Sequence, residues 1–125
     1  MTNIFKDQEH FMKACDQTVG EKNPGQYELY LDLIEEELEE LNVAVLNDDR
    51  VEQLDALIDL LVVTVGAIHS MPFKGELAWN EVMRSNLSKI DPVSGKVIKR
   101  DDGKVLKPDN WQPPQLKQFI GDEHE

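Results

Sequence analysis

Residues 33–41 read Leu33-Ile34-Glu35-Glu36-Glu37-Leu38-Glu39-Glu40-Leu41, and this stretch decides the fold. In a helix of about 3.6 residues per turn, each residue advances roughly 100° around the axis. The apolar side chains of this region then fall on one stripe: Tyr27, Ile34, Leu38, Leu41 and Val45. Such a stripe on an acidic segment is typical of a helix that packs one face against a protein core. We therefore predict a helix from about residue 26 to residue 46.

The acidic residues of this helix divide between two further faces. A wholly polar face collects Glu28, Asp32, Glu35, Glu39 and Asn42. A third face carries three acids beside two apolar residues: Glu36, Glu37 and Glu40, with Leu33 and Ala44. A helix that needed acids only for solubility could place all of them on its polar face. The three acids at the edge of the apolar surface therefore indicate a function.

A second acidic cluster interrupts an apolar segment over residues 51–69. Nearly all of this segment is Leu, Val, Ile and Ala, which predicts a helix that is buried on most sides. Asp55 and Asp59 lie one helical turn apart within it, and Glu52 lies on the same side one turn earlier. We take these three acids as one candidate set.

Buried carboxylates repel one another and are costly unless they are paired or bind a metal. Two helices that each carry such a cluster can face one another around hard cations. Ligand sets made only of oxygen suit Mg²⁺ or Mn²⁺. The residues therefore predict a divalent-metal site between these two helices.

Length and charge limit the function classes. The 125 residues fit one domain, and the 40% apolar content favours a folded core. The net charge of −12 argues against binding to nucleic acid or to an anionic membrane surface. Cys15 is the only cysteine, which excludes an intrachain disulfide. The amino-terminal residues have no apolar signal core, and the longest apolar run is too short for a membrane span, so we expect a cytoplasmic protein.

Four helices and a tail account for the whole chain. We expect helices over about residues 4–19, 26–46, 50–70 and 76–89, with an Asx-rich turn at residues 47–49 that caps the third. Residues 91–125 alternate turn-forming and apolar stretches, which predicts a short irregular or hairpin tail. The expected fold is thus an all-α four-helix bundle forming a single domain, with a helical core over about residues 4–90.

The ordered motifs resemble the MazG-like all-α nucleoside triphosphate pyrophosphohydrolases, a superfamily that includes dimeric dUTPases and phosphoribosyl-ATP pyrophosphohydrolase. The pattern Glu-Glu-x-x-Glu followed by Glu-x-x-Asp is matched by residues 36–40 and 52–55. Residues 82–89 and 102–108 also look like one branch of it. The resemblance extends from about residue 11 to residue 114. The acidic pattern also fits one residue earlier, and helical geometry decides against that register because Glu35 and Glu39 fall on the polar face.

The resemblance implies Mg²⁺-dependent hydrolysis between the α- and β-phosphates of a nucleoside triphosphate, with nucleotide house-cleaning as the expected role. The expected metal ligands are Glu36, Glu37, Glu40, Glu52, Asp55 and Asp59. Mn²⁺ is a possible substitute, and Glu37 is the expected general base. The expected substrate contacts are Gln17, Asn86, Lys89 and Lys104. Gln17, Phe73 and Trp79 are candidates for the base pocket.

Three other interpretations compete with this one. A non-enzymatic acidic bundle that acts as an interaction protein is the main alternative, and it predicts exposed acids and indifference to metal. An acidic mimic of nucleic acid would cover its surface with acids instead of grouping them by face. A di-iron bundle needs Glu-x-x-His pairs, and neither His10 nor His69 has a Glu three residues before it.

Because the two acidic helices carry more apolar surface than one subunit covers, we also expect a homodimer or homotetramer.

Overall fold

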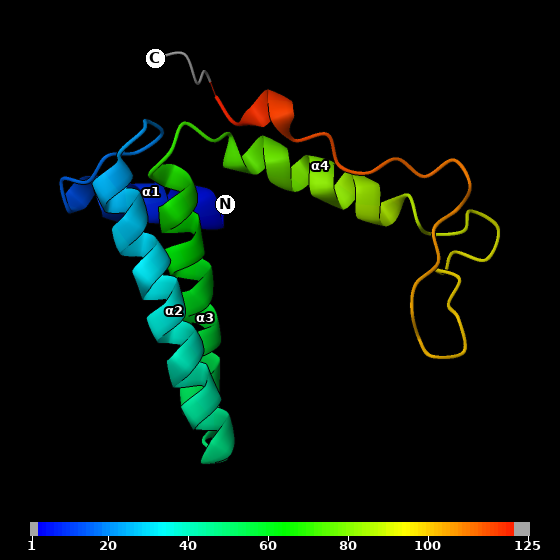
Figure 1. Ribbon diagram of the computed structural model, residues 1–125, viewed down its shortest axis with the longest axis horizontal. Coiled ribbons are helices and arrows are strands. Elements are labelled where there is room, and N and C mark those ends of the chain that lie inside the picture. Colours follow the sequence, from blue (N-terminus) through cyan, green and yellow to red (C-terminus); the bar gives the residue numbers. More distant parts are fainter. Residues whose placement is uncertain (1–2, 122–125) are drawn as a thin grey trace. The chain divides into compact units, whose positions relative to one another are not determined.

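The computed structural model describes residues 3–121, which contain four α-helices. They are α1 (Ile4–Ala14), α2 (Pro24–Leu46), α3 (Arg50–His69) and α4 (Gly75–Leu87), followed by the short 3₁₀ helix η1 (Lys117–Phe119) (Figure 1). Within this range the only β-structure is two isolated bridges. The predicted all-α class is therefore confirmed. None of the helices described is both long and apolar enough to cross a membrane.

The described residues form two compact units. The first contains residues 3–75 with residues 120–121, and the second contains residues 76–119. Three helices, α1 to α3, thus belong to the first unit, and α4 belongs with the tail that follows it. The sequence had predicted a single domain with a helical core over about residues 4–90 and a tail from residue 91.

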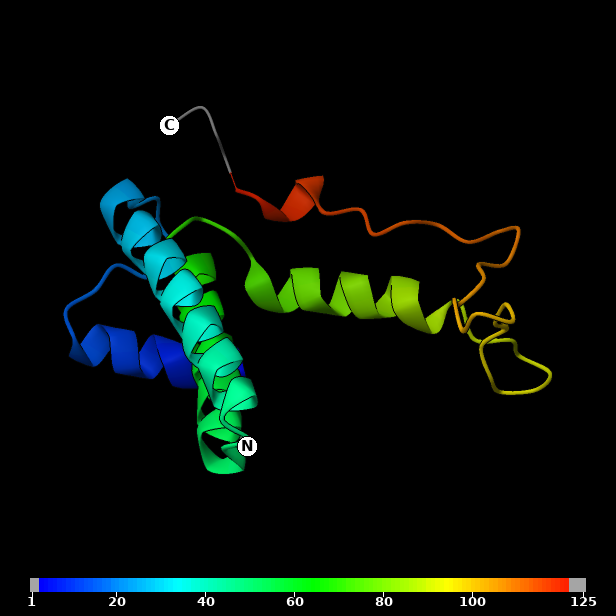
Figure 2. The same cartoon turned by 60° about the horizontal axis from the view of Figure 1, so that its bottom comes forward.

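The antiparallel pair of α2 and α3 is the framework of the first unit, and α1 packs against α3 (Figures 1 and 2). Tyr30 and Ala44 are the buried residues of α2, and they lie on the face that meets α3. Near one end of the pair, a Cβ added to Gly66 would lie 2.3 Å from Cε1 of Tyr30. Near the other end, Gln53 Nε2 donates to the Ala44 carbonyl at 3.4 Å. The absence of a side chain at Gly66 lets the two helices approach closely, which fixes their register.

The turn between α2 and α3 forms as the sequence predicts. Asp48 adopts φ +52°, and the Asp49 N–H donates to the Ala44 carbonyl at 2.9 Å, which closes the carboxyl end of α2. The Asp49 carboxylate accepts the Glu52 N–H at 3.1 Å and caps the start of α3. The predicted capping by the 47–49 turn is confirmed.

The first helix is shorter than predicted. It ends at Ala14, whereas the sequence had suggested an end near residue 19. Asp16 takes φ +58°, and the Gln17 N–H donates to the Met12 carbonyl at 2.9 Å. This Schellman arrangement ends the helix. Aspartate can adopt the left-handed backbone conformation that usually requires glycine. The helix therefore ends here without the glycine that would have marked its end in the sequence.

A polar network holds the segment between α1 and α2 against both long helices. The Gln26 side chain accepts the Thr18 N–H at 3.0 Å, and its Nε2 donates to the Thr18 carbonyl and to Ser70 Oγ. Ser70 is fully buried, and its hydroxyl donates to the Gly66 carbonyl at 2.8 Å. These bonds satisfy polar groups that would otherwise be costly to bury, and they place Gln17 beside α2.

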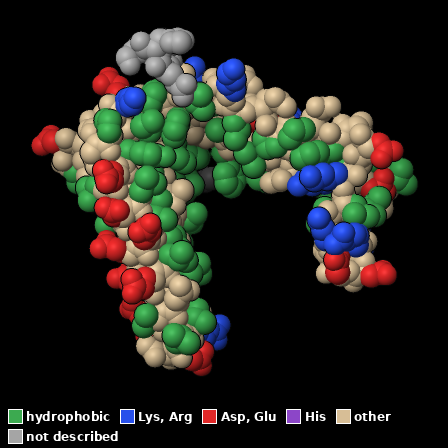
Figure 3. Space-filling view, viewed as in Figure 1, with side chains coloured by type: hydrophobic (Ala, Val, Ile, Leu, Met, Phe, Trp, Pro, Cys, Tyr) green, Lys and Arg blue, Asp and Glu red, His purple; other side chains and the backbone are tan. Residues whose placement is uncertain are grey.

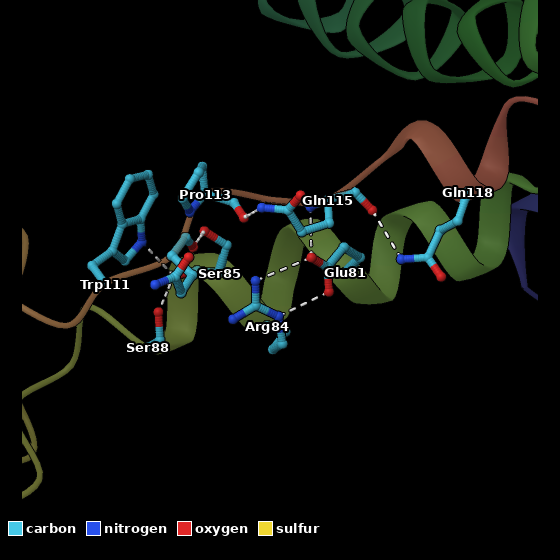
Figure 4. Close-up of polar contacts among 9 residues, drawn as sticks. Glu81, Arg84, Ser85, Ser88, Trp111, Pro113, Gln115 and Gln118 are labelled. Atoms are coloured by element: carbon cyan, nitrogen blue, oxygen red, sulfur yellow. Dashed lines mark hydrogen bonds and ion pairs between the residues drawn. The ribbon is translucent and has the colours of Figure 1, made fainter.

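The second unit consists of α4 and a tail that runs back along it (Figure 4). Glu81 accepts two bonds from the Arg84 guanidinium and one from the Gln115 N–H at 2.7 Å, and these interactions lower the pKa of Glu81 to about 2. The bridges pair Ile90 with Val97 and Lys99 with Val105, forming two successive tight loops. Over residues 91–121 the tail is therefore the irregular, hairpin-like segment that the sequence predicts, and residues 122–125 of the predicted tail lie outside the described residues.

Candidate functional site: an acidic seam between two helices

A hollow of about 540 Å³ lies where α2 and α3 approach their connecting turn. Most of its lining side chains are acidic or polar. They are Glu36, Glu37, Glu39, Glu40, Val43, Ala44, Asn47, Asp49 and Glu52. In the space-filling view, acidic side chains gather along α2 and hydrophobic ones lie beside them (Figure 3). Four of the six predicted metal ligands line this hollow, and Asp55 and Asp59 do not.

Glu37 occupies the middle of the seam between α2 and α3. It lies seven residues from Tyr30 and seven from Ala44, on the buried line of α2. Its side chain is half-buried, and its Oε2 atom is buried without a hydrogen-bond partner. A buried acceptor that lacks a partner is uncommon in a folded protein and calls for an explanation such as an ion or a catalytic role.

Four carboxylates influence one another's charge across the two helices: Glu37 and Glu40 from α2, and Asp55 and Asp59 from α3. Burial, together with the neighbouring carboxylates of Glu40, Asp59 and Asp55, raises the pKa of Glu37 to about 7. Burial and the carboxylates of Asp55 and Glu40 also raise the pKa of Asp59. A compensating positive charge would favour the ionised form of each group.

The remaining acids of the predicted set are solvent-exposed. They are Glu36, Glu40, Glu52 and Asp55. Among residues 3–121, no three His, Cys, Asp or Glu side chains stand close enough together to hold a metal ion as they are arranged here. The chemistry nevertheless fits a hard cation, because the donors are all carboxylates and one buried oxygen has no other partner.

Gln17 does not lie in a helix, contrary to the prediction. It follows the end of α1, and its Oε1 accepts a hydrogen bond from the Tyr30 hydroxyl at 2.5 Å. Its amide oxygen is therefore occupied by a structural contact next to the buried core of Met12, Tyr30 and Ala67. Phe73, the other base-pocket candidate in this unit, packs edge-on against Tyr27 with ring centroids 6.4 Å apart.

The other predicted substrate contacts belong to the second unit. Asn86 is exposed near the end of α4, and its Oδ1 lies 3.3 Å from Lys89 Nζ. Lys104 is exposed in the second tail loop, and Trp79 is exposed on α4. The structure thus brings Asn86 and Lys89 together within one unit.

Sequence reasoning missed two acids that line the hollow. Asp49 was seen only as a capping residue, and Glu39 was assigned to the polar face. Glu39 is indeed exposed, but the hollow is broad enough to include it. The signal for Asp49 was present, since a cap at the start of an acidic helix lies close to that helix's first-turn carboxylate.

The chain belongs to the MazG-like all-α pyrophosphohydrolases, because a family model of this superfamily matches most of its length. More particularly, the sequence model of the phosphoribosyl-ATP pyrophosphohydrolase family matches residues 7–86, more than half of the chain. The chain belongs to this family, which confirms the resemblance seen in the sequence. Family membership makes it a pyrophosphohydrolase that acts on a nucleotide-like substrate. No curated protein gives a significant match to the chain.

Proposed function

We propose that this protein hydrolyses nucleoside triphosphates to a nucleoside monophosphate and pyrophosphate, with a divalent cation, Mg²⁺ or Mn²⁺, as cofactor. Family membership supports the reaction class. The observation that carries the proposal is the buried, unpartnered Oε2 of Glu37 amid three other carboxylates. An acidic bundle without catalytic function would have no reason to bury a carboxylate oxygen in this way.

The reaction places three demands on the protein. Negative charge on the phosphates must be offset, a water must be held in line, and a base must accept its proton. We infer that Glu36, Glu40, Glu52 and Asp55 hold the cation, with Asp59 as a further candidate ligand. A bound divalent cation supplies Lewis-acid charge neutralisation at the phosphates.

We assign the general base to Glu37. It lies deeper in the seam than the other acids of α2, and its buried oxygen has no competing donor. A pKa near 7 suits a group that accepts a proton at neutral pH. The water oxygen attacks phosphorus, the proton passes to Glu37, and the α–β phosphoanhydride breaks to release pyrophosphate.

We also infer that two or more copies of the chain associate. Several apolar side chains on α3 remain half or more exposed in the single chain: Val51 at 77%, Leu54 at 63%, and Ile58 and Leu61 at 50% each. Exposed apolar side chains that lie together on one helix are typical of a protein interface. The expected assembly is a homodimer or homotetramer formed through helical faces.

A product assay on a substrate panel tests the proposed function. The panel contains the canonical nucleoside triphosphates, their deoxy and modified forms, and phosphoribosyl-ATP, each with and without Mg²⁺. We expect equal amounts of monophosphate product and pyrophosphate, only when metal is present. Release of inorganic phosphate instead would contradict cleavage between the α- and β-phosphates. Turnover of phosphoribosyl-ATP alone would contradict the nucleoside triphosphate class, and no turnover of any member would favour the acidic interaction protein.

A further inference from the structure

The side chains that face one another across α2 and α3 lie in layers two helical turns apart. Along α2, Tyr30 is buried, Glu37 is half-buried and Ala44 is buried, at intervals of seven residues. Along α3, the buried Gly66 and the half-buried Asp59 are also seven residues apart. Seven residues span about two turns, or about 10.5 Å of helix. Because the two helices are antiparallel (Figure 1) and Tyr30 meets Gly66, the next layer places Glu37 opposite Asp59.

The layer of Tyr30 and Gly66 has no space for one more carbon atom. A Cβ added to Gly66 would lie 2.3 Å from Cε1, 2.5 Å from Cδ1 and 2.7 Å from Cζ of the Tyr30 ring. Carbon atoms that are not bonded to each other prefer a separation of about 3.5–4.0 Å, so the ring and the added carbon would have to separate by about 1 Å. The tyrosine ring therefore rests directly against the backbone of α3.

Both sides of this contact are fixed by their surroundings. The Tyr30 side chain is 5% exposed, packs in the buried core, and donates its hydroxyl to Gln17 Oε1 at 2.5 Å. On the other side, the Gly66 carbonyl accepts the hydroxyl of the fully buried Ser70 at 2.8 Å. Because the ring has no free space to turn into, a group added at Gly66 should increase the spacing between the two helices.

The carboxylates of the seam depend on the same spacing. Glu37 shares its layer with Asp59, and the carboxylates of Glu40 and Asp59 influence each other's charge across the two helices. The candidate metal ligands thus come from both helices. Mg²⁺ requires oxygen ligands at about 2.0–2.1 Å in regular octahedral geometry, whereas Ca²⁺ accepts about 2.3–2.6 Å and irregular geometry. A change of a few tenths of an ångström in the helix spacing is therefore enough to favour one ion over the other.

We propose that Gly66 and Tyr30 determine the cation selectivity of the acidic seam, because their contact holds α2 and α3 at the spacing that suits Mg²⁺ better than the larger Ca²⁺. Both are positioning residues, since each acts through the spacing of the helices that carry the ligands. The inference rests on the proposed function for the presence of a divalent cation in the seam. All the residues involved belong to the first unit.

Cation binding without substrate tests this inference. The full-length parent and Gly66→Ala proteins are titrated with MgCl₂ and with CaCl₂ at pH 8 and constant ionic strength, and calorimetry gives the dissociation constants. We expect Gly66→Ala to weaken Mg²⁺ binding at least about tenfold, the lower range for residues that orient metal ligands. Ca²⁺ binding should weaken much less, so the ratio of the two dissociation constants should shift toward Ca²⁺.

Ser70→Ala is the matched control. It removes the buried hydroxyl that bonds to the Gly66 carbonyl, so it should destabilise the same end of the helical pair without adding volume between the helices. Its ratio of Mg²⁺ to Ca²⁺ affinity should equal that of the parent. Circular dichroism and thermal melts of each variant identify the temperatures at which it is folded, and the titrations are made there.

Tyr30→Val provides a second, opposite change. It removes the three ring atoms that approach Gly66, so the helices can move closer together and the ratio should shift toward the smaller ion, Mg²⁺. Combined with Gly66→Ala, it makes room for the added carbon and should return the ratio toward the parent value. Where Gly66→Ala alone does not fold, Tyr30→Val and the double variant decide in its place.

The outcomes separate this inference from the proposed function. A ratio that shifts in Gly66→Ala but not in Ser70→Ala, and that Tyr30→Val restores, supports the inference. A parent that binds Mg²⁺, with an unchanged ratio in Gly66→Ala and Tyr30→Val or an equal shift in Ser70→Ala, overturns the inference alone. A parent that binds neither cation overturns the proposed cofactor and this inference with it.

Discussion

Glu37 and Asp59 lie on opposite sides of the α2–α3 seam, and the Asp59 carboxylate helps to raise the pKa of Glu37 to about 7. Both residues are half-buried, and burial is the largest cause of the raised pKa in each case. Like charges on facing helices destabilise the folded chain unless a proton or a cation offsets them. This relationship leads to the first three predictions.

Stability of the metal-free protein should fall as the pH rises from about 4.5 to about 7. Glu37 has a raised pKa in the folded state, so between these values the folded protein binds more protons than the unfolded chain does. The groups facing it, Glu40, Asp55 and Asp59, are all acidic and strengthen the effect. Thermal melts in EDTA at pH 5, 6, 7 and 8 measure it. The fall in melting temperature with rising pH should be smaller in Glu37→Gln than in the parent. An equal fall in both proteins would mean that other groups cause the pH dependence.

Mg²⁺ should raise the melting temperature at pH 8, where the carboxylates are ionised. A cation that binds only the folded state stabilises it by mass action, by about 2.7 kcal/mol at a hundred times the dissociation constant. Melts across a Mg²⁺ series measure the shift, and NaCl at equal ionic strength is the control. Absence of a shift at millimolar Mg²⁺, with no heat in calorimetry, would count against a metal site in the seam.

Glu37→Gln should lower the rate of triphosphate hydrolysis at least about 10²-fold while the protein stays folded, the lower range for loss of a positioned base. Glu35→Gln is the control, because it removes the same charge from a residue two positions earlier in the helix. Glu35 is exposed and does not line the hollow. It should leave the free energy of unfolding within about 0.5 kcal/mol of the parent, and activity unchanged. Steady-state kinetics of both variants measure the difference. Loss of activity in Glu35→Gln alone would mean that the acidic motif starts one residue earlier.

Gly66→Ala should destabilise the first unit by about 1–3 kcal/mol, the usual cost of overfilling a packed contact. The new Cβ would lie 2.3 Å from Cε1 of a Tyr30 ring that is buried and bonded to Gln17. Gly25→Ala is the control, because the nearest atom to a Cβ there is 4.0 Å away. In a helix that change should be neutral or favourable by up to about 1 kcal/mol. Urea unfolding compares the two, and equal stability would show that Tyr30 moves aside.

Light scattering at micromolar concentration should give a mass of at least two chains. Leu54→Glu places a charge on the exposed apolar face of α3 and should shift the population toward monomer. Leu54 is 63% exposed in the single chain, so the change should leave the fold of one subunit intact. A parent protein that is monomeric at this concentration would refute the predicted association.

Local signals in the sequence determined the helices and the acidic motif. The 3.6-residue period of apolar residues along residues 27–45 specifies a helix, because any other winding would scatter that stripe. The Asx residues at 47–49 specify the turn, because their short side chains bond to neighbouring backbone groups. The same period separated Glu37 from Glu35 without any knowledge of what either residue contacts.

Only the tertiary structure decided which acid is buried. Glu36, Glu37 and Glu40 share one face in the sequence, yet Glu37 alone of the three is half-buried. That choice follows from how closely α2 approaches α3, which the contact of Tyr30 with Gly66 sets across 36 residues of chain. The hydrogen bond from the Trp111 indole to the Ser85 carbonyl likewise depends on the tail running back along α4. The helical period predicts the direction in which a side chain points, whereas the burial of that side chain depends on which other element packs against it.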